Sequence, residues 1–134
     1  MLHGGCLCSG VRYEIDSSVE DMTNCHCGMC RKAHGAAYAT FVTVQGKSFR
    51  YTQGEELVET YQSSPELGRA FCRVCGSSLA VIEPKTAEVF VAAGTLDEDP
   101  GIRPESHIFV GSKAPWLDIH DDTPSFDAYP PEEG

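Results

Sequence analysis

Seven cysteines are the residues of this 134-residue chain whose types and spacing could do chemistry. Thiolates are strong zinc ligands, four in a closed tetrahedral site and three where one position stays open for a substrate. An odd number of thiols cannot all be paired as disulfides. The cysteines therefore indicate metal binding, divided as four and three. They form three groups: the N-terminal pair Cys6 and Cys8, the tripod Cys25, Cys27 and Cys30, and the knuckle pair Cys72 and Cys75.

Two of the groups have spacings that suggest a local geometry. Thiols two residues apart on an extended strand point to the same face, and we expect this of Cys6 and Cys8. The sequence Cys72-Arg-Val-Cys75 is followed by Gly76, as in a zinc knuckle. Its turn aims both sulfurs at one point, and the glycine tolerates the backbone conformation needed there. Each pair can therefore give two ligands to one ion.

Spacing alone leaves open which four cysteines share a site. In one division, Cys27 and Cys30 join the knuckle pair as a ribbon of two knuckles. In the other, the N-terminal pair joins the knuckle pair and leaves the tripod as a compact local site. The second division keeps every group intact, and we favour it on that ground. Without metal, the cysteines could be buried free thiols or a redox dithiol. Seven cysteines in three tight clusters argue against the first, and the second would want a lone Cys-x-x-Cys on a βαβ pattern, which is absent.

The elements that must position the cysteines are predicted to be short antiparallel strands. Runs rich in Val, Phe, Tyr and Thr recur between glycines, which is typical of such strands. The proline-rich last third is expected to be extended and to wrap over the sheet. We predict a mainly β domain over residues 1–129, followed by an acidic tail over 130–134. Strands are expected over residues 11–15, 38–44, 48–52, 57–62, 69–72, 78–83, 88–93 and 107–110, and one short helix over 28–34.

Composition limits the classes of partner. The chain has 10 Lys and Arg against 20 Asp and Glu, a formal net charge of −10. Such an acidic surface argues against nucleic acid and anionic membrane as partners. No apolar run approaches the roughly 20 residues of a membrane span, and the N-terminus lacks the basic and apolar regions of a signal peptide. We expect a cytoplasmic protein, in which thiols stay reduced.

These motifs resemble the glutathione-dependent formaldehyde-activating enzymes and their relatives around centromere protein V. All seven cysteines fall on motif positions of that family. The resemblance implies a β-tent, a fold of antiparallel sheets pinned by zinc. It also implies two Zn²⁺ ions, one structural at the N-terminal and knuckle pairs and one catalytic at the tripod. The matching segments are residues 4–8, 11–13, 25–32, 71–77, 93–97, 107–110, 113–116 and 124–126.

The activity that the resemblance implies is reversible addition of glutathione to formaldehyde, giving S-hydroxymethylglutathione. A free thiol of pKa about 8.5 is only a few per cent ionised at neutral pH, and the thiolate is the nucleophile. A tripod zinc could hold a small thiol deprotonated beside a small aldehyde. Run backward, the same site is a carbon–sulfur lyase. The alternative is a binding module with both zincs structural, which a fourth protein ligand such as His26 or His34 would favour.

Other residues near the motifs have expected roles. Glutathione carries two carboxylates, so an acidic protein needs local cations, and Arg31 and Lys32 directly after the tripod are the candidates. His26 could carry a proton or replace a ligand, although a residue between two ligands more often points away from them. For His34 and His107 as well, a role at the zinc and a purely structural role are both possible. Phe109 and Trp116 are expected in the core, and residues 97–99 in a solvated acidic loop.

Overall fold

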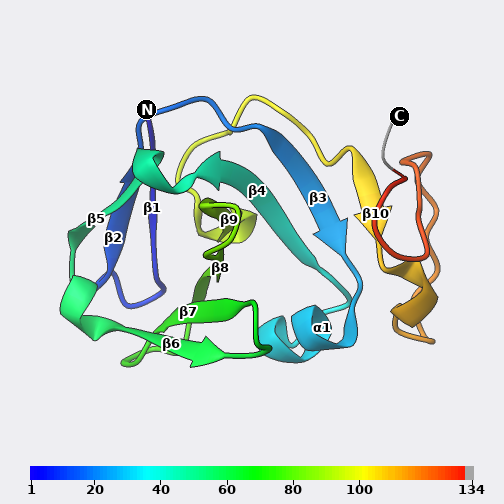
Figure 1. Ribbon diagram of the computed structural model, residues 1–134, viewed down its shortest axis with the longest axis horizontal. Helices are drawn as coiled ribbons and strands as arrows, with labels where there is room; N and C mark the ends of the chain where they lie inside the picture. Colours follow the sequence, from blue (N-terminus) through cyan, green and yellow to red (C-terminus); the bar gives the residue numbers. More distant parts are fainter. Residues whose placement is uncertain (132–134) are drawn as a thin grey trace.

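The computed structural model describes residues 1–131, so residues 132–134 of the expected acidic tail lie outside the described part. Strands dominate, and they form two sheets (Figure 1). The smaller sheet has the order β1-β2-β5, with β1 (Leu2–Gly5), β2 (Arg12–Ile15) and β5 (Phe49–Gln53). The larger has the order β10-β3-β4-β9-β8-β7-β6, with β3 (Asp21–Cys25), β4 (Ala39–Gln45), β6 (Val58–Gln62), β7 (Gly68–Cys72), β8 (Ser78–Glu83), β9 (Glu88–Ala92) and β10 (Ser106–Ile108).

Helical structure is sparse. One α-helix, α1 (Gly28–His34), lies between the end of β3 and the β6–β7 hairpin (Figure 1). Its bounds are those predicted, and Gly35 ends it in the left-handed conformation with φ 59°. Within residues 1–131, three short 3-10 turns lie between strands, η1 (Gly46–Ser48), η2 (Glu55–Leu57) and η3 (Ala93–Thr95), and a fourth, η4 (Val110–Ser112), follows β10. No helix within residues 1–131 is long and apolar enough to cross a membrane.

The prediction of a mainly β fold with one short helix is confirmed, with two differences in the strands. β1 and β3 were not predicted, because Leu2-His-Gly-Gly5 and Asp21-Met-Thr-Asn-Cys25 lack an apolar or β-branched run. Both become strands through pairing with β2 and β4. The sheets are antiparallel except that β10 runs parallel to β3. This pairing follows from the long return of the chain across the molecule between β9 and β10 (Figure 1).

The main hydrophobic core lies where the two sheets face each other. Tyr13 and Ile15 of β2 are buried against Val42, Val44 and Val91 from the centre of the larger sheet. Alternation along β2 makes this possible, since Tyr13 and Ile15 point inward while their neighbours are half-buried. The core therefore fixes the small sheet, which carries the N-terminal cysteine pair, against the large one.

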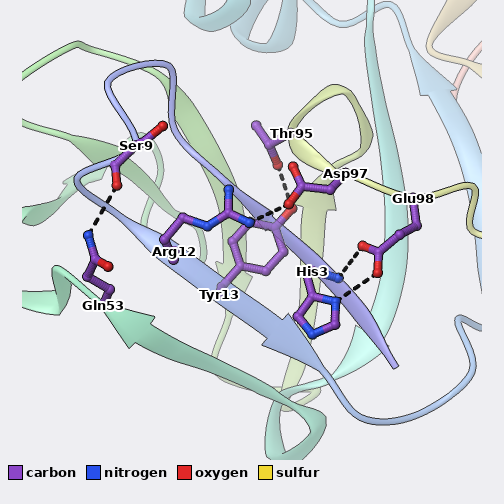
Figure 2. A network of polar contacts seen from close by, with 8 residues as sticks. All are labelled: His3, Ser9, Arg12, Tyr13, Gln53, Thr95, Asp97 and Glu98. Carbon is purple, nitrogen blue, oxygen red and sulfur yellow. Dashed lines mark hydrogen bonds and ion pairs between the residues drawn. The ribbon is translucent and has the colours of Figure 1, made fainter.

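Polar contacts tie the loop after β9 to the small sheet (Figure 2). The Tyr13 hydroxyl lies 2.6 Å from Thr95 Oγ1, and Arg12 forms an ion pair with Asp97. His3 donates its backbone N–H to Glu98 at 2.7 Å, and its ring contacts the same carboxylate. The acidic run at residues 97–99 is therefore not the merely solvated loop that was expected. It holds the first strand in place next to the N-terminal cysteine pair.

The last third of the chain packs along one edge of the larger sheet (Figure 1). His107 of β10 donates its backbone N–H to Pro124 at 2.8 Å, and Phe126 donates to His107 at 2.9 Å. The segment is extended, as predicted, but it lies beside β10 instead of over the sheet face. Trp116 is 71% exposed, so its expected place in the core is wrong. Phe109 packs against buried core residues, as predicted.

Candidate metal centres

The structure brings the seven cysteines into two groups. Within each group, the sulfur atoms all lie within 4.8 Å of one another. Tetrahedral zinc with Zn–S near 2.3 Å needs sulfurs about 3.8 Å apart, so both groups have the compactness of a metal site. The first group is the N-terminal pair with the knuckle pair, and the second is the tripod. The division favoured from the intact groups is the one found, and the ribbon of two knuckles is not.

The first group stands at the junction of the two sheets. Cys6 and Cys8 follow β1, and Cys72 ends β7. The sulfurs of Cys6 and Cys8 are 3.5 Å apart, and Cys8 is 3.9 Å from Cys72. The N-terminal pair lies in a turn and not on a strand as expected, with Ser9 at φ 64° closing it. The turn brings both sulfurs to the same side, which a strand was expected to do.

The knuckle at Cys72 and Cys75 has the predicted form. Gly76 adopts φ 80° and donates its N–H to the Cys72 carbonyl at 2.8 Å. The Ser77 hydroxyl accepts the backbone N–H of Leu7 at 2.9 Å, and so links the knuckle to the turn that carries Cys6 and Cys8. That hydroxyl also lies 3.2 Å from Cys75 Sγ, and this contact helps to lower the pKa of the Cys75 thiol to about 5. The geometry favours a thiolate, the form that binds metal.

The tripod is formed at the turn from β3 into α1. Cys25 ends β3, Cys27 is the N-cap of α1, and Cys30 lies in its first turn. Cys27 Sγ accepts the backbone N–H of Cys30 at 3.3 Å. Hydrogen bonds from Cys25 and Cys30 lower the pKa of Cys27, while the same contact with Cys27 raises that of Cys25.

Apolar side chains surround the tripod. Cys25 and Cys30 are buried in a cluster with Ala39, Phe41 and Val81. The partly buried side chains of Leu67, Phe90, Ile108 and Phe109 pack against this cluster. Such surroundings exclude water and strengthen any charge interaction at the sulfurs. The tripod therefore sits in a drier environment than the first group, where Cys8 is exposed.

No histidine or carboxylate among the described residues joins the tripod as a fourth ligand. His26 points away from the sulfurs, as a residue between two ligands often does. Its ring is fully buried and contacts His107 and Tyr38. His34 packs edge-on against Phe41 and burial lowers its pKa. Within residues 1–131, the tripod is thus a set of three protein ligands.

Arg69 is a neighbour of the tripod that the sequence reasoning missed. Its Nη2 donates to Cys30 Sγ at 3.6 Å from strand β7. Arg69 also lines a hollow of about 190 Å³ together with His34 and Tyr61, and no cysteine lines that hollow. Arg69 and Cys30 are 39 positions apart, and no local sequence pattern predicts a contact between them. Only the pairing of β7 with its neighbours reveals it.

Arg31 and Lys32, the predicted cations, lie on α1 directly after Cys30. The Lys32 side chain is exposed. The Arg31 side chain is half-buried, and its Nε is enclosed without a hydrogen-bond partner. Both stand close in sequence to the tripod, and their role in anion binding stays a prediction.

Several polar atoms close to the tripod in sequence or in space are left without hydrogen-bond partners. Three buried side-chain atoms of the described residues lack a hydrogen-bond partner: His26 Nδ1, Arg31 Nε and Arg69 Nη1. His26 and Arg31 each adjoin tripod cysteines in sequence, and Arg69 contacts Cys30. Buried unpaired polar atoms are rare and call for an explanation such as an ion or water. The two guanidinium N–H groups are donors that water or an anion would satisfy, whereas the three sulfurs of the tripod are the donor set that fits zinc.

The fold and the two cysteine groups define a β protein with two candidate metal centres, one of four sulfurs and one of three. A model of the glutathione-dependent formaldehyde-activating enzyme family matches residues 1–112. The chain belongs to this family.

Individual relatives agree with this placement. A putative glutathione-dependent formaldehyde-activating enzyme of Halomonas elongata is 32% identical over 98% of this chain and 90% of its own length. An uncharacterized lyase of Schizosaccharomyces pombe is 30% identical over 57% of this chain and 53% of its own length. The crystal structure of a Rhodobacter sphaeroides protein superposes with a TM-score of 0.61 at 26% identity, over 76% of this chain and 91% of that one.

Proposed function

We propose that this protein is a zinc-dependent carbon–sulfur lyase and thiol-adduct synthase, which joins glutathione to formaldehyde as S-hydroxymethylglutathione in the reducing cytoplasm. Its family and the names of two relatives support this reaction class. The observation that carries the proposal is the tripod, whose three sulfurs gain no fourth ligand from the described residues. Three protein ligands with an open position are typical of catalytic zinc, whereas structural sites are closed.

In this proposal, Cys25, Cys27 and Cys30 hold the second zinc. Zinc bound there would supply a Lewis acid that keeps a thiol ionised near neutral pH. The apolar side chains around the tripod exclude water from the reacting sulfur. In the synthesis direction, a bond forms between the thiolate sulfur and the aldehyde carbon. The C=O double bond becomes single, and its oxygen takes up the proton that the thiol released on ionisation. The lyase direction reverses each of these changes.

The other predicted residues have separate tasks. The first group of four cysteines holds a structural zinc and joins the start of the chain to β7. Arg31 and Lys32 contact the carboxylates of glutathione, so that they affect affinity more than the rate of the bond-forming step. Residues 1–129 form the single domain that carries both sites.

Calorimetric titration of glutathione into the zinc-loaded protein tests the proposal, followed by an assay for the formaldehyde adduct. Cys27→Ala should remain folded but lose both glutathione binding and adduct formation, because the tripod is local in sequence. Met29→Ala is the matched control: it changes an exposed residue between two tripod cysteines and should leave both readouts unchanged. If the zinc-loaded parent binds neither glutathione nor another small thiol, the protein is instead a zinc-stabilised binding module.

A further inference from the structure

The guanidinium of Arg69 is fixed at two points between the β6–β7 hairpin and the tripod. Its Nη2 donates to Cys30 Sγ at 3.6 Å, and its Nε donates to Ser63 Oγ at 3.1 Å. Ser63 belongs to the loop between β6 and β7, while Cys30 belongs to α1. Because two nitrogens of one planar group are bound to different elements, the orientation of the plane is set by the fold.

Strand register explains why this arginine reaches the tripod. Arg69 pairs with Val81 on β8, and Val81 is part of the apolar cluster that contains Cys25 and Cys30. Side chains alternate along β7, so Ala70 and Cys72 are buried on one face and Arg69 lies on the other. The register therefore directs the guanidinium toward the tripod and the knuckle cysteine Cys72 away from it.

The charge of the tripod shows what such a cation would do. Three thiolates around one Zn²⁺ carry a formal charge of −1, and a fourth thiolate from a substrate makes it −2. The chain already carries −10, so this added negative charge is unfavourable. Among residues 1–131, Arg69 is the basic residue that donates a side-chain hydrogen bond to a cysteine sulfur. Its positive charge therefore lies beside one of the three sulfurs of the tripod.

We propose that Arg69 is a positioning residue of the tripod, which orients Cys30 and offsets enough negative charge for the site to hold its metal and accept a substrate thiolate. This role rests on the proposed function. It differs from the role given to Arg31 and Lys32, because Arg69 acts on the sulfur cluster and not on the carboxylates of the substrate. Partners that hydrogen-bond to metal ligands in this way affect metal affinity and activity by roughly 10–100-fold.

The hollow next to Arg69 is consistent with this assignment. None of the residues that line it is acidic, although the chain has 20 Asp and Glu. His34, which also lines it, has a pKa lowered by burial and by the charge of Arg69. No carboxylate there competes with Cys30 for the guanidinium. Among residues 1–131, Arg69 thus contacts a cysteine sulfur and a serine hydroxyl and forms no ion pair with a carboxylate.

Cobalt loading tests the role of Arg69 without measuring activity. Hydrogen bonds to a thiolate raise the energy of its sulfur-to-Co²⁺ charge-transfer band. Arg69→Met should therefore shift the band of the tripod to lower energy and weaken metal binding there roughly 10–100-fold in competition with a chelator. Arg69→Lys should recover part of the affinity. Arg73→Met, which removes the same charge from an exposed position, is the control and should change neither readout.

Two further comparisons separate the possible results. Arg69→Met should weaken binding of glutathione and of 2-mercaptoethanol, which lacks carboxylates, by similar factors; a loss confined to glutathione would mean that Arg69 binds carboxylate, and would overturn the proposal. Ser63→Ala keeps the charge but removes the Nε contact, and should move the band in the same direction by less, even if Arg69→Met does not fold. If all these variants keep the charge-transfer band and the metal affinity of the parent, the role of Arg69 is refuted and the proposed function is left intact. A parent that binds only one metal would refute both.

Discussion

His26 Nε2 lies 2.8 Å from His107 Nδ1, and both rings are almost completely buried. His107 Nε2 in turn lies 3.0 and 3.1 Å from the two carboxylate oxygens of Asp121. A carboxylate only accepts, so His107 donates to Asp121 through Nε2 and its Nδ1 accepts from His26. Asp121 thus sets the tautomer of both rings. It also connects the C-terminal segment to the residue between Cys25 and Cys27.

Removing His107 should destabilise the protein strongly. His107→Ala leaves the buried N–H of His26 without an acceptor and opens a cavity beside β3, so we expect a loss of roughly 2–4 kcal/mol in the free energy of unfolding. Urea unfolding followed by circular dichroism measures it. His120→Ala, at an exposed histidine, is the control and should stay within about 0.5 kcal/mol of the parent. Equal stability of the two variants would show that the His26–His107 contact contributes nothing.

Loss of the first metal group should prevent folding. Cys75→Ser removes one of four sulfurs at the junction of the two sheets. Structural zinc contributes apparent free energies of roughly 10–16 kcal/mol in small zinc domains, as much as the whole stability of a typical domain. We expect an unfolded or aggregated product with a reduced zinc content, measured by circular dichroism and metal analysis. Val74→Ala, at an exposed site between the knuckle cysteines, should fold and keep its zinc.

The sequence predicted the grouping of the cysteines better than it predicted some of the strands that carry them. Cysteine spacing predicted the three groups, but it left open which four cysteines share one metal site. The proximity of Cys6 to Cys72 depends on how the two sheets pack, which spacing does not indicate. β3 could not be predicted, since its polar residues form a strand only through pairing with β4 and β10. Arg69 was missed for the same reason. Its contact with Cys30 requires the register of β7, which no local pattern indicates.

The two metal sites should release their ions in a fixed order. Three sulfurs hold an ion less firmly than four, so a chelator should remove the tripod zinc first and leave the fold intact. Release is measured with a chromophoric chelator while circular dichroism follows the fold. We expect the first ion to be released without a change in the circular dichroism spectrum, and the second to be released together with unfolding. Cys27→Ala should abolish the first phase only. Loss of all metal in one step together with the fold would contradict the assignment of two distinct sites.

Tyr13 should make the protein sensitive to alkaline pH. Burial raises the pKa of Tyr13 to about 12 from an unfolded value near 10. Above pH 10, the unfolded chain releases this proton while the folded chain retains it, so stability falls as the pH rises from about 10 to 12. The full loss from this residue is roughly 2–3 kcal/mol. Burial also raises the pKa of Tyr51 to about 12, and this tyrosine contributes in the same direction.

Urea unfolding of the zinc-loaded protein at a series of pH values between 9 and 12 measures this dependence. Tyr13→Phe loses the contact with Thr95 and should be about 1 kcal/mol less stable at pH 8. Its stability should then decline roughly half as steeply as that of the parent, because only the partly buried Tyr51 remains of the two tyrosines whose pKa is raised to about 12. Tyr61→Phe, at a residue that is 66% exposed, should keep the parental slope. If Tyr13→Phe declines as steeply as the parent, the buried phenol is not the group that makes the fold sensitive to alkali.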